Sequence, residues 1–383
     1  MKYYLIAGEA SGDMHGSKLL QGIFGNDPDA EVRYWGGDNM AAVAGAENMV
    51  SHYKDGAFMG IGEVAAHLGK LLGRIKRCKK DIEAWSPDVV ILIDYGGFNL
   101  RIAKFAKKIG IKTFFYIPPK VWAWHQSRAK KVKRRVDELF VIFPFEVDFY
   151  KKYGMEAHYM GNPIMDEIEV KKQKTEDPVK FLKEIGLDGN KKEGGYVIAM
   201  LPGSRKQEIS YNLPFMIEVA ESMPESAFIL AAVSWLDMSL YDSYLKKSKA
   251  GNITVLVDRT YESLFVSDAA MVTSGTATLE TALLKIPEVV LYNCSPLTYH
   301  LAKSAIRIKY LSLVNIILDK MAVKEFIQRD MRVENVRSEL LSIINDNERR
   351  SVLDADYELL ADKVGNMGSS YRVAEQMVKI LKK

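Results

Sequence analysis

Continuous apolar runs alternate with helical stretches in the first half of the chain. Residues 2–7, 87–94, 112–117 and 138–143 are apolar at nearly every position, which is typical of strands buried on both faces of a sheet. Strands that alternate with helices pair in parallel, because each helix carries the chain back across the sheet. The pattern therefore predicts an α/β domain over residues 1–168.

The second half of the chain resumes this alternation after an interruption. Residues 169–193 are rich in lysine and acidic side chains and predict a boundary between domains. We expect a second α/β domain over residues 190–345, followed by helices over residues 346–383 that pack back on the first domain. The apolar runs of the second domain are residues 195–201, 226–233, 253–257, 269–273 and 287–292.

Four loops of small and polar residues come directly after predicted strands. They are residues 8–16, 94–99, 202–208 and 273–280. Ligands of parallel sheets bind outside the carboxyl ends of the strands, so these loops predict a ligand site. Two such domains, joined once, predict that the site lies in a cleft between them.

The loop at residues 8–16 has the composition of a sugar-binding segment. Its glycine spacing does not fit the dinucleotide fingerprint, and Glu9 and Asp13 would repel a pyrophosphate but could bind sugar hydroxyls. We expect the next helix to begin near residue 17. A tight turn capped by Ser11 or Asp13 is the alternative, although it does not account for Glu9.

Asp94 ends an otherwise apolar strand and is the candidate general base. Gly96 and Gly97 follow it and would let a ligand approach closely. The unperturbed pKa of an aspartate, about 3.9, is low for a base at neutral pH, so this role requires a raised pKa. A cap for the next helix is the alternative role for this carboxylate.

Two further loops could hold a diphosphate. Residues 274–278 are all small, so their N–H groups could approach phosphate oxygens at a helix N-terminus, and Glu280 could bind a ribose diol. Arg205 follows a Pro-Gly-Ser turn, and arginine suits two-point binding of a phosphate. The alternatives are a capping box with Thr278 or Glu280, and a solvated surface arginine.

Two basic segments could bind a membrane surface, and a pair of tryptophans could line a cleft for sugars or acyl chains. Residues 57–75 have helical apolar spacing and end in a basic cluster, which fits an amphipathic helix on an anionic membrane or a core-facing helix with a basic outer face. A second basic run, residues 128–135, allows the same two interpretations. Trp122 and Trp124 either line a cleft or pack within a rigid loop.

Composition narrows the class of protein. The 383 residues carry 53 Lys+Arg and 49 Asp+Glu, a net charge of +4, which gives no reason to expect a nucleic-acid partner. The two cysteines, Cys78 and Cys294, have no metal-ligand spacing and fit a reducing cytoplasm. We expect no signal peptide, no membrane span and no metal, because no motif or apolar run of the required kind is present.

Several short segments occur in an order that is characteristic of one protein family, although each segment alone is a weak signal. They are residues 7–13, 59–64, 93–99, 121–124, 144–146, 161–163, 201–205, 274–280 and 312–315. Together they resemble the lipid-A-disaccharide synthase family across nearly the whole chain.

The resemblance implies a GT-B fold, with two Rossmann-like parallel-sheet domains and a cleft between them. It implies inverting transfer of 2,3-diacylglucosamine from UDP-2,3-diacylglucosamine to 2,3-diacylglucosamine 1-phosphate, without a metal or other cofactor. The products are the β-1,6-linked lipid A disaccharide phosphate and UDP. It also implies a cytoplasmic protein, peripheral on the anionic inner face of the cytoplasmic membrane of a Gram-negative bacterium, and leaves a homodimer open.

The same resemblance assigns roles to residues. Asp94 would deprotonate the acceptor hydroxyl, with Glu9 and Ser11 contacting the sugar. The residues expected to bind UDP are Arg205, Ser274, Gly275, Thr276, Ala277 and Glu280. Those expected in the acceptor pocket or elsewhere in the cleft are Gly8, Asp13, Asn99, Trp122, Trp124 and Asn315. Those expected to face the membrane are Phe58, Ile61, Val64, Leu68, Leu71, Leu72, Arg74 and Arg77.

The chain departs from the family pattern at two places. Gly96 and Gly97 replace the usual proline and aspartate, so Asp94 would act without a second carboxylate, and Lys120 replaces the usual serine after Pro119. Two alternative functions stay open. One is another GT-B UDP-sugar enzyme, such as a UDP-N-acetylglucosamine 2-epimerase, which would leave the apolar and basic residues 57–80 unexplained. The other is a non-catalytic UDP-sugar-binding protein that docks on membranes.

Overall fold

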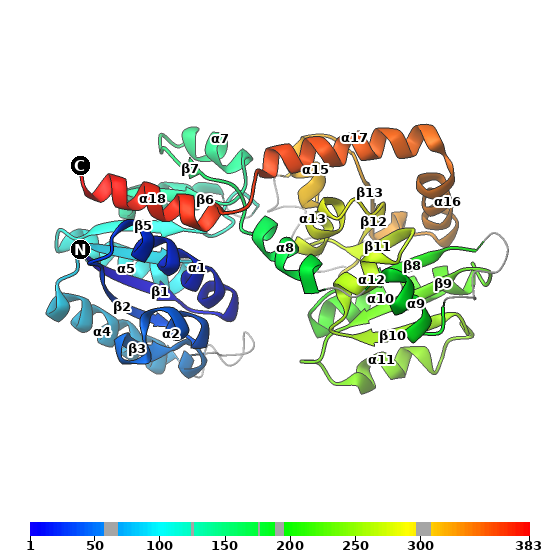
Figure 1. Ribbon diagram of the computed structural model, residues 1–383, viewed down its shortest axis with the longest axis horizontal. Helices are drawn as coiled ribbons and strands as arrows, with labels where there is room; N and C mark the ends of the chain where they lie inside the picture. Colours follow the sequence, from blue (N-terminus) through cyan, green and yellow to red (C-terminus); the bar gives the residue numbers. More distant parts are fainter. Residues whose placement is uncertain (57–67, 124–125, 175–176, 188–194, 296–307) are drawn as a thin grey trace. The chain divides into compact units, whose positions relative to one another are not determined.

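The chain divides into two compact units, each built on its own parallel sheet (Figure 1). Unit 1 contains Met1–Pro163 and Val364–Lys383, and unit 2 contains Ile164–Lys363. The computed structural model describes residues 1–56, 68–123, 126–174, 177–187, 195–295 and 308–383.

The sheet of unit 1 has seven strands in the described residues, in the order β3-β2-β1-β4-β5-β6-β7. Neighbouring strands pair in parallel, so that Tyr3 lies opposite Val32 on one side and Val89 on the other. The apolar runs of the sequence form four of its five interior strands, as predicted. The strands are β1 (Lys2–Ala7), β2 (Glu31–Gly36), β3 (Met49–His52), β4 (Val89–Ile93), β5 (Lys112–Tyr116), β6 (Glu138–Val141) and β7 (His158–Tyr159).

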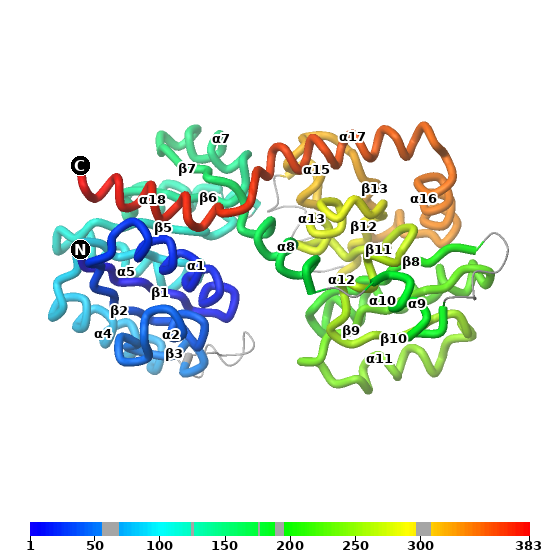
Figure 2. The backbone as a smooth tube through the Cα atoms, in the orientation of Figure 1, coloured from blue at the N-terminus to red at the C-terminus, as the bar shows by residue number. Residues whose placement is uncertain are grey.

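Helices cover both faces of this sheet, and the last helix of the chain is one of them (Figure 2). Helix α18 packs beside α1 against β1, with Leu19, Ile23, Val373 and Met377 in one buried cluster. Gly22 allows this close packing, because a Cβ atom there would lie 2.7 Å from the Cβ of Ala374. The helices of unit 1 are α1 (Ala10–Asn26), α2 (Asp38–Ala44), α4 (Leu68–Trp85), α5 (Gly96–Lys108), α6 (Ala129–Arg135), α7 (Phe145–Lys151) and α18 (Ser369–Leu381).

The sheet of unit 2 has the order β10-β9-β8-β11-β12-β13 among the residues described. Five of its strands coincide with the apolar runs predicted from the sequence, and β13 was not predicted. The strands are β8 (Val197–Leu201), β9 (Ala227–Ala232), β10 (Ile253–Val257), β11 (Ala269–Thr273), β12 (Glu288–Tyr292) and β13 (Lys324–Ile327). The helices are α8 (Ile164–Lys174), α9 (Pro178–Glu184), α10 (Lys206–Glu221), α11 (Met238–Leu245), α12 (Thr260–Phe265), α13 (Thr276–Leu283), α15 (Leu313–Leu318), α16 (Val333–Asn345) and α17 (Asn347–Val364).

The helices expected over residues 346–383 do not form one block. Helix α17 stays in unit 2, where Arg349 donates to the carbonyl oxygen of Ala322 and pairs with Glu339. Tyr357 of the same helix is fully buried. Only α18 packs on unit 1, so the predicted boundary at residue 346 is replaced by one at Val364.

Candidate functional site

Asp94 lies at the carboxyl end of β4, where the chain leaves the sheet of unit 1. Asp94 and Tyr95 both have left-handed backbone conformations, with φ of +47° and +49°. Non-glycine residues rarely adopt this conformation, and such strain concentrates at functional sites. Asp94 is half-buried, and this burial raises its pKa, although the N–H of Tyr95 and the charge of Lys120 oppose the rise. A raised pKa is the property that a carboxylate needs to act as a base at neutral pH.

Asn99 fixes the backbone around Asp94. Its side chain is fully buried, and its Nδ2 donates to the carbonyl oxygens of Asp94 at 2.8 Å, Ile93 at 3.2 Å and Ile6 at 3.4 Å. These contacts join the carboxyl ends of β1 and β4. Asn99 was predicted in the acceptor pocket, and the structure instead makes it a support for the strand ends.

The start of α1 lies beside the β4 turn. Gly8 packs so closely on Tyr95 that a Cβ atom there would lie 2.2 Å from Cγ of its ring. Glu9 occupies the N-cap position of α1, and both Glu9 and Ser11 are exposed at this helix start. The structure therefore brings Gly8, Glu9 and Ser11 to the same edge of the sheet as Asp94.

The segment predicted as a loop to residue 16 is helical from Ala10 onward. Its glycines serve packing rather than a ligand loop. A Cβ atom at Gly12 would lie 3.3 Å from the Cβ of Ala7, and one at Gly16 would lie 2.6 Å from Sδ of Met40. Only glycine lets α1 approach β1 and α2 this closely, which is why the small residues are here.

Asp13 is not available to a sugar, because its carboxylate caps α2. It is 1% exposed and accepts from the N–H groups of Gly37 at 2.6 Å, Asn39 at 3.0 Å and Met40 at 3.2 Å. The amide Nδ2 of Asn39 donates to it as well, at 2.9 Å. A carboxylate at a helix N-terminus satisfies N–H groups that have no partner within the helix. This structural role replaces the predicted ligand contact.

Trp122 is an interior residue. Its side chain is 6% exposed, and its Nε1 donates to Oε1 of the buried Glu146 at 3.1 Å. Glu146 also accepts from the N–H groups of Ile142 and Phe143, while burial raises its pKa to about 7. The rigid-loop alternative thus describes Trp122 better than the predicted cleft lining. Trp124 lies outside the described residues.

Lys120 carries a positive charge close to two carboxyl groups of unit 1. Its charge lowers the pKa of both Asp94 and Glu146, and its Nζ lies 6.0 Å from the ring centre of Phe143. Pro119 beside it packs on Gly96, where a Cβ atom would lie 2.3 Å from Cγ of the proline. The β5 turn is thereby held against the β4 turn, with the lysine at the candidate base.

We expect Lys120→Ser to move the acidic limb of the pH profile of kcat/KM to higher pH. Without the lysine charge Asp94 keeps its proton to higher pH, so the basic form becomes available later as pH rises. The measurement is kcat/KM against pH for both proteins. Lys112→Ser, at the exposed amino end of β5, should leave the limb in place. An unshifted limb in Lys120→Ser would mean that Asp94 is not the titrating base.

In unit 2, the turn after β8 presents Arg205. Glu208 accepts from the N–H groups of Ser204 at 3.0 Å and Arg205 at 3.2 Å, and its Oε1 lies 2.7 Å from Nη1 of Arg205. Gly203 has φ of +111°, which only glycine adopts without strain. The Arg205 side chain is 81% exposed despite its partner, so its guanidinium can also reach an anion.

Trp235 is a candidate residue that the sequence reasoning missed. It is 66% exposed, and its Nε1 donates to the carbonyl oxygen of Ser204 at 3.1 Å, which holds the ring beside the Arg205 turn. An exposed aromatic ring held in place suits a nucleobase. Its position directly after an apolar run was the signal that could have identified it. It lines a cavity of about 410 Å³ with Lys171, Lys174, Val233, Asp258, Thr260, Tyr261 and Glu262.

The small-residue turn after β11 leads into α13, as its sequence predicted. Gly275 is the N-cap residue, and Thr278 donates through Oγ1 to the carbonyl oxygen of Gly275 at 2.9 Å. The first N–H groups of a helix have no partner within it, so those of Thr276 and Ala277 can bind an anion. Glu280 lies one turn further on and accepts from the Tyr261 hydroxyl at 2.6 Å. Tyr261 thus joins the predicted ribose ligand to the cavity beside Trp235.

Asn315 is buried and holds α15 to β13. Its Nδ2 donates to the carbonyl oxygen of Val323 and to Oε1 of Glu325, both at 2.8 Å, and its Oδ1 accepts from the N–H of Val323 at 3.0 Å. These bonds commit the amide group to the protein. Asn315, predicted in the cleft, therefore supports the neighbouring loop.

Two of the residues predicted to face a membrane hold α4 to the sheet instead. The guanidinium of Arg74 lies 4.9 Å from the ring centre of Trp35, and Nη2 of Arg77 donates to the carbonyl oxygen of Val50 at 2.7 Å. A guanidinium group stacks on aromatic rings and donates hydrogen bonds to carbonyl oxygens. Both side chains thus make contacts that hold α4 beside the sheet.

The outward face of α4 keeps an apolar and basic character. Leu72 is 54% exposed, and Lys76 and Lys80 lie exposed along the same helix. Leu71 is half-buried. Phe58, Ile61 and Val64 lie outside the described residues, as does the side chain of Leu68. Among the helices that the structure describes, none is long and apolar enough to cross a membrane.

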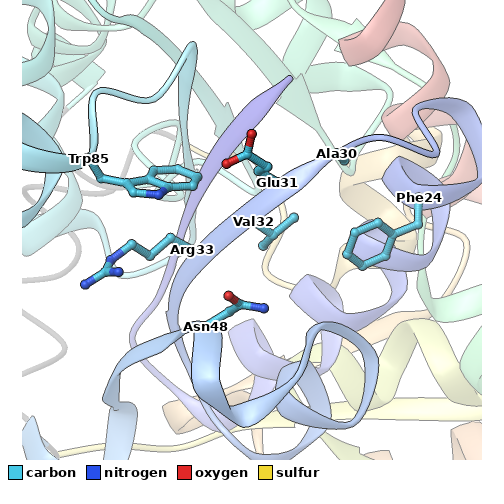
Figure 3. Close-up of a pocket in the computed structure, with 7 residues that line it drawn as sticks. All are labelled: Phe24, Ala30, Glu31, Val32, Arg33, Asn48 and Trp85. Atoms are coloured by element: carbon cyan, nitrogen blue, oxygen red, sulfur yellow. The ribbon is translucent and has the colours of Figure 1, made fainter.

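A cavity of about 290 Å³ lies away from the Asp94 turn (Figure 3). Figure 3 shows Trp85 and Arg33 on one side of it and Phe24 on the other. It is formed at the amino end of β2, whereas Asp94 follows the carboxyl end of β4. Arg33 donates to both oxygens of Asp81, at 2.7 and 2.9 Å, and so serves the packing of α4. This cavity is not part of the candidate site.

Comparison with known proteins decides the family. A family model described as lipid-A-disaccharide synthetase matches residues 3–381. The chain belongs to this family. The lipid-A-disaccharide synthase of Syntrophus aciditrophicus is 34% identical over 383 residues, 99% of this chain and 97% of that protein. That of Geobacter metallireducens is 36% identical over 386 residues, with the same coverage of 99% and 97%.

Solved structures share the architecture of this lipid-A-disaccharide synthetase family member. A putative UDP-N-acetylglucosamine 2-epimerase from Listeria monocytogenes aligns with a TM-score of 0.64 at 12% identity, over 100% of this chain and 96% of that one. The UDP-GlcNAc 2-epimerase from Neisseria meningitidis, bound to UDP-GlcNAc, aligns with a TM-score of 0.62 at 12% identity, over 99% and 100%. The predicted GT-B fold with two Rossmann-like parallel-sheet domains is confirmed. The predicted glycosyltransferase class is confirmed by the family.

Other predictions stay predictions. Within the residues described, no three His, Cys, Asp or Glu side chains gather as they would around a metal ion. The metal-independent reaction, the cleft between domains and the homodimer are not tested by this observation.

Proposed function

We propose that the protein transfers 2,3-diacylglucosamine from UDP-2,3-diacylglucosamine to 2,3-diacylglucosamine 1-phosphate. The products are the β-1,6-linked disaccharide phosphate and UDP. Family membership over residues 3–381 supports this reaction. The observation that carries it in the structure is Asp94, a strained, half-buried carboxylate with a raised pKa at the carboxyl end of β4.

In this mechanism Asp94 accepts the proton of the acceptor 6-hydroxyl as the oxygen attacks the anomeric carbon of the donor. The bond between that carbon and the UDP oxygen breaks, and UDP leaves with the electron pair, so the configuration inverts. Glu9 and Ser11, exposed at the same edge, are positioned to accept from or donate to sugar hydroxyls. Burial makes the Asp94 carboxylate a stronger base than a solvated aspartate.

The donor nucleotide belongs to unit 2 in this proposal. The N–H groups at the start of α13 and the Arg205 guanidinium would stabilise the charge that grows on the leaving diphosphate. Trp235 offers a ring for the base, and Glu280 offers a carboxylate for the ribose hydroxyls. Because the Arg205 guanidinium is cationic and the N–H groups of α13 are dipolar, they can supply the neutralisation that a metal ion supplies in other transferases.

The test is UDP release from UDP-2,3-diacylglucosamine, with and without the acceptor, in detergent and EDTA. We expect release only with the acceptor, unaffected by EDTA, and a disaccharide product with a β linkage. Epimerisation of plain UDP-N-acetylglucosamine, without release from the acylated donor, would favour the epimerase alternative. Loss of activity in EDTA that added Mg²⁺ restores would contradict the metal-independent mechanism.

We also propose that the outer face of α4 rests on the anionic inner face of the cytoplasmic membrane. Exposed Leu72 would enter the interface, while Lys76 and Lys80 would meet lipid phosphates. Acylated substrates are held in a bilayer, so a docked enzyme meets them without extracting them into water.

We expect Lys76→Glu/Lys80→Glu to reduce sedimentation with phosphatidylglycerol vesicles by about tenfold or more, since each basic residue contributes about 1 kcal/mol at such a surface. The matched control is Lys246→Glu/Lys247→Glu, an exposed pair on unit 2. Arg74 and Arg77 are unsuitable because both pack α4. Equal sedimentation of the two double variants would contradict docking through α4.

A further inference from the structure

The carboxylate of Glu325 in β13 is held by hydrogen bonds from the loop before α15 and from α15 itself. The N–H of Ser312 donates to Oε1 at 2.8 Å, and the N–H of Leu311 lies 3.1 Å from Oε1 and 3.0 Å from Oε2. Nδ2 of Asn315 donates to Oε1 at 2.8 Å. Hydrogen bonds to a charged acceptor are about twice as strong as neutral ones, so this carboxylate fixes the loop that precedes α15.

The same loop also holds the turn before α13. The Ser274 hydroxyl donates to the carbonyl oxygen of Leu311 at 3.0 Å. That carbonyl belongs to the peptide group whose N–H, on Ser312, donates to Glu325. A carboxylate that accepts from one end of a peptide polarises its other end, so the carbonyl oxygen becomes a better acceptor. Glu325 and Ser274 are thus linked through a single peptide group.

Both hydrogen-bond donors of Ser274 are used within the protein. Its hydroxyl proton goes to Leu311, and its N–H donates to the carbonyl oxygen of Leu291 at 3.0 Å. A phosphate oxygen needs donors, so Ser274 cannot serve a diphosphate as donor in this arrangement. Its remaining role is to fix where the backbone turns into Gly275, Thr276 and Ala277.

A second carboxyl group, that of Glu288, lies close to Glu325 in the sheet. Glu288 of the neighbouring strand β12 is completely buried, and neither of its oxygens has a hydrogen-bond partner among the described residues. Burial, and then the charge of Glu325, raise the pKa of Glu288 well above its usual range. The donors of Leu311, Ser312 and Asn315 all bond to Glu325, so Glu325 is the carboxylate that fixes the loop.

We propose that Glu325 is a positioning residue for donor binding. Glu325 fixes the peptide group between Leu311 and Ser312, and this peptide group fixes Ser274. Ser274 in turn positions the N–H groups at the start of α13 that bind the diphosphate of the nucleotide donor. The inference rests on the proposed function, because that function assigns the diphosphate to α13. A carboxylate repels a diphosphate, so Glu325 acts through the loop and not by contact.

Preorganised donors are worth more than donors that must be ordered on binding, because the protein has already lost the conformational freedom. Glu325→Gln keeps one acceptor oxygen but removes the charge and places an amide donor beside the N–H groups. The loop is then held less firmly, and binding must order the turn. We therefore expect weaker nucleotide binding without loss of the fold.

The test is a double-mutant cycle on the full chain, with the Kd for UDP measured by calorimetry. We expect Glu325→Gln and Ser274→Ala each to raise the Kd by about 5–20-fold. Both changes break the same connection. The double variant should therefore raise the Kd for UDP no further than the single variant with the larger effect. KM for the acylated donor should rise in parallel, while KM for the acceptor stays constant.

The matched control is Glu221→Gln. Glu221 also fixes a loop, accepting from Oγ of Ser248 at 2.9 Å and the N–H of Lys249 at 2.7 Å. This loop lies between α11 and β10, and among the described residues it has no hydrogen bond to Ser274 or α13. The control should leave the Kd for UDP unchanged, whatever it does to the melting temperature. If Glu325→Gln does not fold, Glu325→Asp takes its place in the cycle, with the same expectation.

If the wild-type protein binds UDP, either of two results would overturn the inference. One is an unchanged Kd in Glu325→Gln, and the other is a double variant whose Kd reflects the full product of the two single effects. Failure of the wild-type protein to bind UDP would instead overturn the proposed function, and the inference with it. The wild-type titration therefore separates the two failures.

Discussion

Asp94→Asn lowers kcat by about 10²–10⁴-fold, the contribution of a positioned general base. Asparagine has nearly the same shape, and it tolerates the left-handed conformation that Asp94 adopts, so the loop keeps its form. The Kd for UDP should change little, because the nucleotide belongs to unit 2 in the proposed mechanism. The measurement is acceptor-dependent UDP release under single-turnover conditions.

The same substitution should not destabilise the protein. Burial raises the pKa of Asp94, so the folded state binds this proton more readily than the unfolded chain does. The carboxylate therefore costs stability at pH values above its folded pKa, and this cost disappears as the pH falls through that pKa. At neutral pH, Asp94→Asn should equal or exceed the wild type in free energy of unfolding. A variant that loses activity only because it unfolds would contradict the base assignment.

Asp13→Ala should lower the free energy of unfolding by about 3–5 kcal/mol. The substitution leaves the N–H groups of Gly37, Asn39 and Met40 without their acceptor, and each unsatisfied buried donor costs about 1–3 kcal/mol. That loss is a large part of the stability of a typical domain. The measurement is urea unfolding of the full chain, followed by circular dichroism.

Asp29→Ala serves as the control, since Asp29 is an exposed aspartate in the turn before β2. It should change the free energy of unfolding by less than about 0.5 kcal/mol. Asp13→Asn keeps one acceptor oxygen and should fall between the two. If Asp13→Ala were as stable as the wild type but bound acceptor poorly, the original interpretation of Asp13 as a sugar ligand would be right.

Four of the five interior strands of unit 1 were predictable because burial on both faces leaves a continuous apolar run. The fifth, β2, and the edge strand β3 were missed because neither shows such a run. Residues 31–36 mix charged and aromatic side chains, and β3 has only four residues, Met49–His52, at the edge of the sheet. β13 is equally short and contains Lys324 and Glu325. Strands of this kind are specified by their neighbours rather than by their own pattern.

The parts of the candidate site that interrupt an apolar pattern were predictable. Asp94 stood out because a charged residue ends an apolar strand, and the small residues before α13 stood out as a strand-to-helix turn. Asp13 and Trp122 were assigned to a ligand because their partners come from other elements of the chain. Sequence spacing cannot show that Asp13 caps α2 or that Trp122 donates to Glu146. Glu325 gave no signal at all, since its loop lies in an earlier segment.

The return of the chain to unit 1 at Val364 has a consequence during protein synthesis. The 200 residues of Ile164–Lys363 are made between the two parts of unit 1, which takes roughly 10–40 s at typical elongation rates. Throughout that interval the surface of α1 around Leu19 and Ile23 lacks α18, its cover in the finished molecule. The first unit to leave the ribosome is thus the last to be completed, and its uncovered helix is a natural place for a chaperone to bind.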